Sequence, residues 1–392
     1  AGVAGSIVSL KDYANTWQTN NVTVTPNGTD KINGTNANAT LSTRDQSVTL
    51  VYVDSTKGWR AVQDSTSSVD GTAFITATGG TIVTCGNFKI HVFTGPGTFC
   101  VSQAAAGSAP NDLDYLVVAG GGGGGSAANC AGNSGAAGAG AGGFRESKSG
   151  NTGSYTASPL VTPTSIPASV SPYTITVGAG GIGAWDNTPR NGVNGSVSTF
   201  STITSAGGGK GGQASFGTSS GSPGGSGGGG STVTNAAGTG NTPPVSPSQG
   251  NNGGAGGPCT QAANGGGGGG AGEVGDAGAL QPIGTPGPSW PRGGDGVGTN
   301  FAPPSYGTPG PSGPLRYYAG GGSGGTERDV GPGGLDQIPG GAGGGGYGSN
   351  RLAGGPGTVN TGGGGGGGGG DTPSEAGGTG GSGVVIIRYK FQ

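Results

Sequence analysis

Residues 362–370 read GGGGGGGGG, and shorter runs of six glycines lie at 120–125 and 265–270. Glycine loses more conformational entropy on ordering than any other residue, and it has no side chain to bury in a core. Hydrogen bonds between the backbones of neighbouring segments are therefore the remaining source of order. The extended polyglycine-II helix, with about three residues per turn, points its N–H and C=O groups outward and permits such bonds. The three runs predict a bundle of polyglycine-II helices.

Collagen and disordered linkers are the other structures that are rich in glycine. Collagen requires glycine at every third position, and consecutive glycines break that period. Disorder is disfavoured because strand-like apolar segments adjoin the runs, at residues 115–118 before the first run and at 384–390 after the last. We expect these two strands to pair and to close the bundle at one end. The rods should project from this β base by about 19 Å for six glycines and about 28 Å for nine.

The chain divides into three parts. Residues 1–70 alternate apolar and polar residues, as at 22–25 and 47–53, and predict a small β-module that serves as a stalk or attachment. Residues 71–118 predict a strand-rich neck with strands at 74–77, 81–84 and 88–93. Residues 119–392 predict the polyglycine-II domain with its loops, fed by strands at 173–177 and 196–204. The fold class is all-β plus a polyglycine-II bundle, with little or no α-helix.

Composition argues against several functions. Charged residues are 9% of the chain and the net charge is −2, with no basic stripe of the kind that binds nucleic acid. No apolar stretch approaches the length of about 18 residues that a transmembrane helix needs, so we expect no membrane insertion. The chain has 0 methionines, which predicts a processed product or a part of a longer protein.

The sequence carries little material for catalysis. The single histidine, His91, lies between Ile90 and Val92 in an alternating strand, and we expect it on the polar face of that strand. Gly-x-Gly-x-x-Gly arises by chance in a chain so rich in glycine, and Gly209-Lys210-Gly211 lacks the Ser or Thr that follows a P-loop lysine. Acidic residues are sparse and show no pair suited to a glycan depolymerase. We predict no enzymatic activity, no cofactor and no metal.

Four cysteines allow two interpretations. Cys85 and Cys100 bracket a hairpin-like stretch and predict a disulfide across it, while Cys130 and Cys259 adjoin glycine-rich segments and predict a clip between two loops. The alternative is four small buried thiols. A zinc site is disfavoured because there is no Cys-x-x-Cys and only one histidine.

Loops at the far ends of the rods carry most of the remaining chemistry. We predict them at residues 184–194, 213–223 and 273–315. Aromatic residues on loops stiffened by proline suit recognition, because they supply contact area at low entropic cost. The receptor-binding candidates are Trp185, Asp186, Arg190, Phe216, Trp290, Arg292, Phe301 and Tyr306. The alternative is that these aromatic side chains cap the bundle and shield its end from water.

Several segments resemble the glycine-rich domain of bacteriophage tail-fibre and virion structural proteins. They are DYLVVA with the six glycines that follow it from residue 114, GGFRE at 142–146, YTITVGAGG at 173–181 and VVIIRY at 384–389. The resemblance covers residues 71–392. Segments at 30–34, 48–53 and 58–60 are similar to a short β-module in the fibres of marine phages. Distal adhesins of T-even-like phages also contain polyglycine-II sandwiches with receptor-binding loops at the tip.

The resemblance implies a homotrimeric fibre on the virion surface whose distal part meets the host cell. We therefore expect a tail-fibre adhesin that recognises a host cell-surface glycan or protein, with other virion proteins as further partners. One rival is a structural fibre or capsid decoration that binds no receptor. A second rival is an ice-binding protein, which requires a flat face with regularly spaced threonines, and the threonines here are irregular in sequence.

Overall fold

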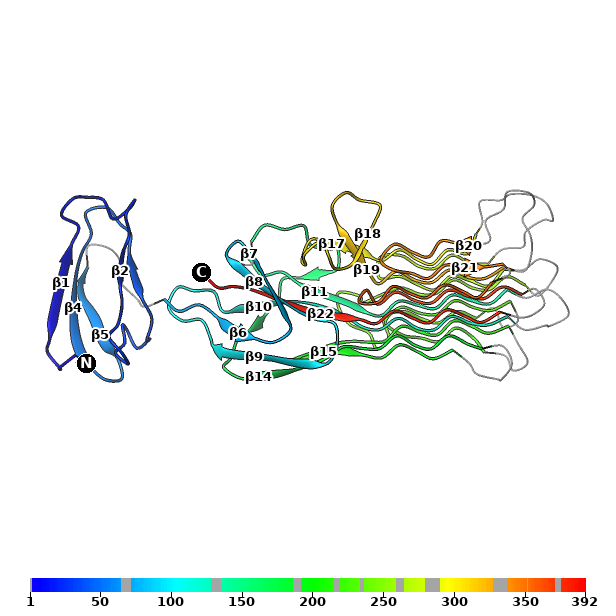
Figure 1. Ribbon diagram of the computed structural model, residues 1–392, viewed down its shortest axis with the longest axis horizontal. Helices are drawn as coiled ribbons and strands as arrows, with labels where there is room; N and C mark the ends of the chain where they lie inside the picture. The colour runs from blue at the N-terminus through cyan, green and yellow to red at the C-terminus, as the bar shows by residue number, and fades with distance from the viewer. Residues whose placement is uncertain are drawn as a thin grey trace.

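The computed structural model describes residues 2–64, 72–127, 135–151, 153–185, 192–214, 219–232, 236–258, 264–278, 290–326, 337–350, 352–370 and 375–392. In these ranges the regular secondary structure is β-strand, which confirms the predicted fold class. The molecule is elongated: an N-terminal β-module, a β-sandwich and a bundle of glycine-rich rods follow one another along its length (Figure 1). No helix in the described part of the chain is long and apolar enough to cross a membrane.

Two small sheets make up the N-terminal module. One is antiparallel with the order β1-β4-β5, and the other pairs β2 with β3. The strands are β1 (Ile7–Lys11), β2 (Val22–Val24), β3 (Ala39–Leu41), β4 (Ser47–Asp54) and β5 (Gly58–Asp64). Alternation along β4 places Val48 and Leu50 in the core with Leu41 and Ile32, as a half-buried strand requires.

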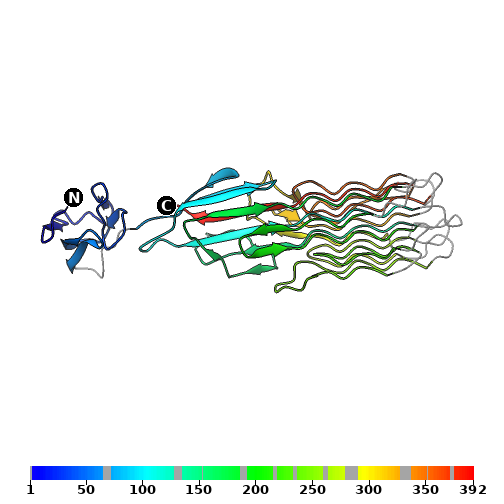
Figure 2. The ribbon, with the colours of Figure 1, turned by 90° about the horizontal axis from the view of Figure 1, so that it is seen from below.

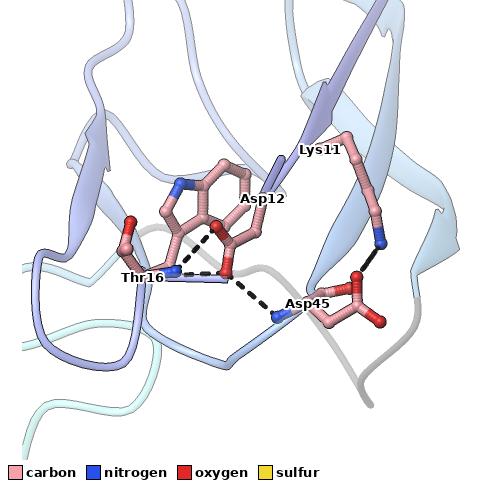
Figure 3. A network of polar contacts seen from close by, with 5 residues as sticks. Lys11, Asp12, Thr16 and Asp45 are labelled. Atoms are coloured by element: carbon pink, nitrogen blue, oxygen red, sulfur yellow. Dashed lines mark hydrogen bonds and ion pairs between the residues drawn. The ribbon is translucent and has the colours of Figure 1, made fainter. Parts of the chain in front are cut away.

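At one end of this module the Asp12 carboxylate orders a turn (Figure 3). It accepts hydrogen bonds from the backbone N–H groups of Thr16 and Asp45, both at 3.0 Å, and of Trp17 at 3.3 Å. Lys11 reaches the same turn through an ion pair with Asp45. Asp45 has a φ of 59°, a left-handed conformation that is unfavourable for most non-glycine residues, and these contacts hold it there.

The sandwich consists of two sheets. The first has the order β12-β11-β10-β22-β8-β7, with β13 pairing to β10, and the second has the order β16-β15-β14-β9-β6. The strands are β6 (Thr76–Thr78), β7 (Thr81–Cys85), β8 (Phe88–Phe93), β9 (Gly97–Gln103), β10 (Asp112–Val118), β11 (Phe144–Ser147), β12 (Val161–Thr162), β13 (Ile166–Pro167), β14 (Pro172–Thr176), β15 (Ser198–Phe200), β16 (Ile203–Ser205) and β22 (Val384–Lys390). The predicted neck thus shares its sheets with strands from later in the chain.

The predicted pairing of the strand before the first glycine run with the closing strand is confirmed. In the antiparallel register, Leu116 of β10 faces Ile386 of β22, and Val118 faces Val384. Odd-numbered residues of both strands, such as Val117, enter the core between the two sheets, and even-numbered ones enter a second core on the other face. Both central strands are therefore buried on both faces, which explains why they read as continuous apolar runs.

Short strands flank the bundle. The order β17-β19-β18 forms a three-stranded sheet at the base, and β20 pairs with β21 near the far end (Figure 1). They are β17 (Val297–Thr299), β18 (Thr308–Pro309), β19 (Arg316–Tyr318), β20 (Gln337–Ile338) and β21 (Gly348–Ser349).

The rods are hydrogen-bonded in a pattern that repeats every third residue. In tract 119–126 the N–H groups of residues i and i+3 donate to the same neighbouring tract, and the bonds are 2.9–3.0 Å long. They run from Gly120 and Gly123 to Ser196 and Val193, from Gly121 and Gly124 to Gly381 and Gly378, and from Gly122 and Gly125 to Gly140 and Ala137. This repeat is the signature of a three-residue turn and establishes the polyglycine-II conformation.

The carbonyl groups of the same tract accept from three further tracts, 206–212, 178–185 and 362–370. Tract 119–126 therefore has six neighbours, three through its donors and three through its acceptors. Tract 362–370 is likewise bonded on several sides, to 320–326, 352–358 and 375–383 among others. Lateral bonding of backbones thus satisfies the peptide groups that a glycine run leaves open, as the sequence predicts.

Close approach of the backbones requires glycine in the interior. A Cβ added at Gly121 would overlap the carbonyl oxygen of Gly363, and one at Gly124 would overlap that of Gly366. Backbone atoms cannot rotate away, as the end of a flexible side chain could. Alanine occurs inside the bundle only where a methyl group fits, as at Ala137 and Ala139, which are fully buried.

Two expectations about the strands of the sandwich are wrong. Residues 196–204 are not one strand, because Ser201 has a φ of 52° and turns the chain between β15 and β16. His91 is not on a polar face: it is 0% exposed, and its Nδ1 lies 2.7 Å from the carbonyl oxygen of Gly79 and its Nε2 3.1 Å from the hydroxyl of Tyr389. A ring nitrogen facing a carbonyl must donate, so Nδ1 carries the proton and Nε2 accepts from the tyrosine.

The predicted disulfide between Cys85 and Cys100 is also wrong. Both are free and exposed, which contradicts the buried-thiol alternative for this pair as well. The segment between them is not a hairpin, because β22 occupies the place beside β8 while β9 joins the other sheet between β14 and β6. Cys130 and Cys259 lie outside the described residues.

Candidate functional site at the distal end of the bundle

A small pocket lies between two rods at the end of the bundle that is farther from the sandwich. Its volume is about 160 Å³, and it is lined by Trp290, Arg292, Gln337, Ile338 and Pro339. Trp290 and Arg292 belong to the rod that leads into β17, and the other three belong to β20 and the residue after it. Trp290 is half-buried, Ile338 is buried, and Arg292 and Gln337 are exposed.

The backbone lattice fixes the two walls of this pocket relative to each other. The buried Ser323, on the rod between them, accepts a hydrogen bond from the N–H of Gly293 at 3.0 Å through its Oγ. The same hydroxyl donates to the carbonyl of Pro339 at 2.6 Å. The N–H of Gly324 donates to the carbonyl of Pro291 at 2.9 Å. The pocket is therefore formed before any ligand arrives.

The guanidinium of Arg292 is weakly engaged. Its Nη2 lies 3.9 Å from Asp295 Oδ1, and both side chains are partly exposed. Asp295 Oδ1 also accepts a hydrogen bond from the N–H of Ala342 at 2.7 Å, which uses part of its accepting capacity. Exposed ion pairs of this kind contribute about 0–1 kcal/mol, so Arg292 can turn to an incoming acceptor at little cost.

This set of groups can bind a ring-shaped or planar ligand with polar edges. The indole and the apolar floor of Ile338 and Pro339 provide contact area, and Gln337 provides both a donor and an acceptor. Arg292 adds a positive charge whose fork geometry suits a carboxylate or another anion. Proton transfer is not among the chemistry that these five residues offer. Within the described residues, no group of three His, Cys, Asp or Glu side chains could hold a metal ion.

The sequence-predicted candidates are not brought together as one loop set. Trp290 and Arg292 share the pocket, and Trp185 is 65% exposed on another rod. Asp186, Arg190 and Phe216 lie outside the described residues.

Phe301 and Tyr306 are placed at the opposite end of the rods, and the prediction that they bind a receptor at the tip is wrong. Phe301 is 0% exposed and packs edge-on against Tyr155, with ring centroids 5.5 Å apart. Tyr306 packs against the same core. The predicted loop 273–315 contains two rods, β17 and β18. Its described residues start at the base beside Asp295, follow the rods and end at the base.

Sequence reasoning missed Gln337, Ile338, Pro339 and Ser323. Ile338 and Leu335 are aliphatic residues between glycine-rich segments, and they were the available signal. Nothing in the sequence places it beside Trp290, because that contact depends on the order of the rods in the bundle.

Buried polar side chains form a layer where the rods meet the distal loops. They are Ser126, Gln213, Ser231, Thr232, Asn264, Thr326, Ser349 and Asn350. Each stands where a tract reaches its distal end, so side-chain donors and acceptors appear where the regular backbone bonding stops. This layer lies at the distal limit of the described rods.

A second and larger hollow, of about 460 Å³, lies in the N-terminal module between its two sheets. Its lining includes Val8, Val24, Leu50 and Trp59, and it also includes Asp30, whose Oδ2 accepts a hydrogen bond from the N–H of Gly2 at 3.0 Å. Four of its twelve lining residues, Val24, Ile32, Leu50 and Trp59, belong to the core of the module or pack against it. The distal pocket combines an aromatic, a cationic and an amide group on a fixed frame, and it is the better candidate for recognition.

Comparison with known proteins gives one result for the long C-terminal part of the chain. A family model described as a glycine-rich domain matches residues 94–390, which is more than half of the sequence. No curated protein matches the chain.

Proposed function

Since the chain belongs to the glycine-rich domain family, and its bundle ends in a preformed pocket, we propose that it is a rigid fibre adhesin. The bundle holds the pocket of Trp290 and Arg292 at the far end of the molecule, where it binds a glycan or a protein on a cell surface. The sandwich and the N-terminal module connect it to the rest of the fibre.

The observation that carries the proposal is the attachment of the pocket to the rods. Ser323 and Gly324 hold both walls through hydrogen bonds of 2.6–3.0 Å. A site that is already ordered loses little conformational entropy on binding, which favours affinity. A scaffold of glycine backbones also leaves the surface residues at the tip free to vary without disturbing a side-chain core.

The resemblance of residues 71–392 to phage tail-fibre domains gives the proposal its setting. On this basis the chain is part of a virion fibre that contains other virion proteins, and its distal end meets the host. The family description itself names no activity and no source.

Binding of the purified full chain to host cells and to a glycan array tests the adhesin role. Trp290→Ala should lower the affinity about 10-fold or more, the usual effect of removing an aromatic anchor. Tyr13→Ala, which removes a side chain that is 96% exposed in the N-terminal module, is the matched control and should bind normally. Normal binding by the Trp290 variant would show that the pocket is not the receptor site.

A structural fibre component without a receptor is the second candidate. The observation that favours it is the row of exposed apolar side chains on one side of the bundle, described below. Under this alternative the unmodified chain binds no cells, while particles that lack it fail to assemble.

A further inference from the structure

The rods on the surface of the bundle expose every third residue. Because a polyglycine-II turn contains about three residues, positions i, i+3 and i+6 point the same way and recur about every 9 Å. On tract 178–185 the exposed positions are Ala179, Ile182 and Trp185. On tract 352–359 they include Ala353, Pro356 and Val359, and Thr379 is the exposed residue in the middle of tract 375–383.

These three tracts lie side by side in one row. The N–H of Gly380 donates to the carbonyl of Gly181 at 2.8 Å, and the N–H of Gly357 donates to that of Thr379 at 2.8 Å. The middle tract also bonds to 119–126 and 362–370, which lie beneath it. Four consecutive neighbours around this rod leave one flat side open. We call this side the apolar face: Ala179, Ile182, Trp185, Ala353, Pro356, Val359 and Thr379.

Large exposed hydrophobic side chains of the bundle gather on this face. Ile182, Trp185 and Val359 are 62%, 65% and 66% exposed. The adjoining Val193, Val197 and Leu352 are 51%, 45% and 50% exposed. The opposite side is formed by tracts 219–223, 236–242, 249–258 and 273–278. Among its described residues, Val274 is the large hydrophobic side chain that is exposed. In Figure 2 tracts 352–359 and 375–383 of the apolar face are orange to red, and the opposite side consists of green to yellow rods.

We propose that the apolar face binds the same face of a second copy of this chain. Contiguous exposed apolar area marks interaction sites on soluble proteins. Among the described residues of the three tracts, only Glu375, at the distal end, is charged. Two copies can therefore pack together without placing like charges opposite each other along most of the face. A second copy also carries the same repeat of about 9 Å, so the side chains of one row can lie over the glycines of the other.

This inference is independent of receptor binding, and it reassigns Trp185 from recognition to assembly. Sedimentation of the full chain under reducing conditions tests it. The unmodified protein should sediment as a dimer of the 36.6-kDa chain, because a face that binds its own copy joins two chains. A trimer would contradict this pairing. The double variant Ile182→Lys, Thr379→Lys should raise the dissociation constant at least tenfold, because two desolvated lysines oppose each other in the interface.

Thr239→Lys, Ala255→Lys is the matched control, since it places two lysines at exposed positions on the opposite side. It should leave the oligomer intact. Hydrogen exchange of the rod amides confirms that both variants keep the bundle folded. A monomeric unmodified chain, or equal dissociation of both variants, or an oligomer that survives the lysines at residues 182 and 379, would each overturn the proposal.

Discussion

The carboxylate of Asp12 illustrates how single residues stabilise the parts of this chain that lack glycine rods. Burial raises its pKa, but the backbone N–H donors of Thr16, Asp45 and Trp17 outweigh burial and lower the pKa below its usual 3.8. The folded module therefore stabilises the ionised carboxylate of Asp12 relative to the unfolded chain.

The sign of the pH dependence follows from this lowered pKa. The unfolded module binds a proton at Asp12 more readily than the folded one, so the stability that Asp12 contributes is complete above the unfolded pKa of 3.8. It is lost as the pH falls through the folded pKa. Hydrogen exchange of residues 2–64 measured from neutral to acid pH should show this loss, and Asp12→Asn should be less stable at neutral pH and less sensitive to acid. An unchanged acid response in the variant would contradict the assignment.

His91 and Phe301 show where prediction from single residues ends. A histidine between two β-branched residues reads as part of a polar face, yet both faces of its sheet are covered, and alternation alone does not reveal a second layer. Burial lowers the pKa of His91, and the positive charge of Lys89 lowers it further against the opposing effect of the Gly79 carbonyl. Phe301 follows a glycine-rich segment and precedes two prolines, but its burial depends on Tyr155, far away in sequence.

Among elements, the polyglycine rod is stable only as part of a lattice. Each interior glycine gives and receives lateral bonds, and the space that a Cβ would need is filled by a neighbouring carbonyl. The rule differs from that of a β-strand, whose side chains stand clear of the ladder on two faces.

Gly124→Ala is expected to destabilise the bundle by about 3 kcal/mol or more, the upper range for overpacking, because the added methyl group meets the carbonyl of Gly366. Gly95→Ala is the control, since nothing lies within 4 Å of a Cβ there. Hydrogen exchange of the rod amides, measured at increasing denaturant, should show a lower unfolding free energy for Gly124→Ala than for Gly95→Ala. Equal stability of the two variants would mean that the rods can move apart and that the lattice is less rigid than the hydrogen bonds indicate.

The sequence predicted which segments form rods and which form strands, but it predicted less well which strands pair with each other. Uninterrupted glycine runs left one conformation that satisfies the backbone, and the β-branched runs at 115–118 and 384–390 identified the strands that close the domain. The hairpin turn at Ser201 and the separation of β8 from β9 were not predictable, because each results from pairing with distant strands. The disulfide prediction failed for the same reason.

Two kinds of interior occur in this molecule, one made of side chains and one made of backbone. The sandwich and the N-terminal module bury side chains, whereas the rods bury peptide groups and methylene surface. Two of the five residues of the candidate site, Trp290 and Arg292, could be predicted from composition and loop position. Ile338 and its neighbours could not, because adjacency of rods is a property of the assembled bundle.

Heat capacity should report this difference. Exposure of apolar surface raises the heat capacity of unfolding and exposure of polar surface lowers it, and ordinary domains reach about 12–15 cal/mol/K per residue. The glycine-rich bundle exposes mainly peptide groups, so calorimetry of the full chain should give less than about 12 cal/mol/K per residue. A value at or above the ordinary range would show that hidden apolar contacts, and not backbone bonding, dominate its stability.

The lateral bond from Gly121 to Gly381 spans 260 residues of sequence. During translation at about 5–20 residues per second, the first glycine run leaves the ribosome roughly 13–52 s before the tract that surrounds its last side is made. Throughout that interval the N–H groups of Gly121 and Gly124, which bond to that tract, have only water as a partner. A chain that stops before residue 376 lacks the tract that covers this side of rod 119–126, so the N–H groups of Gly121 and Gly124 keep water as their partner.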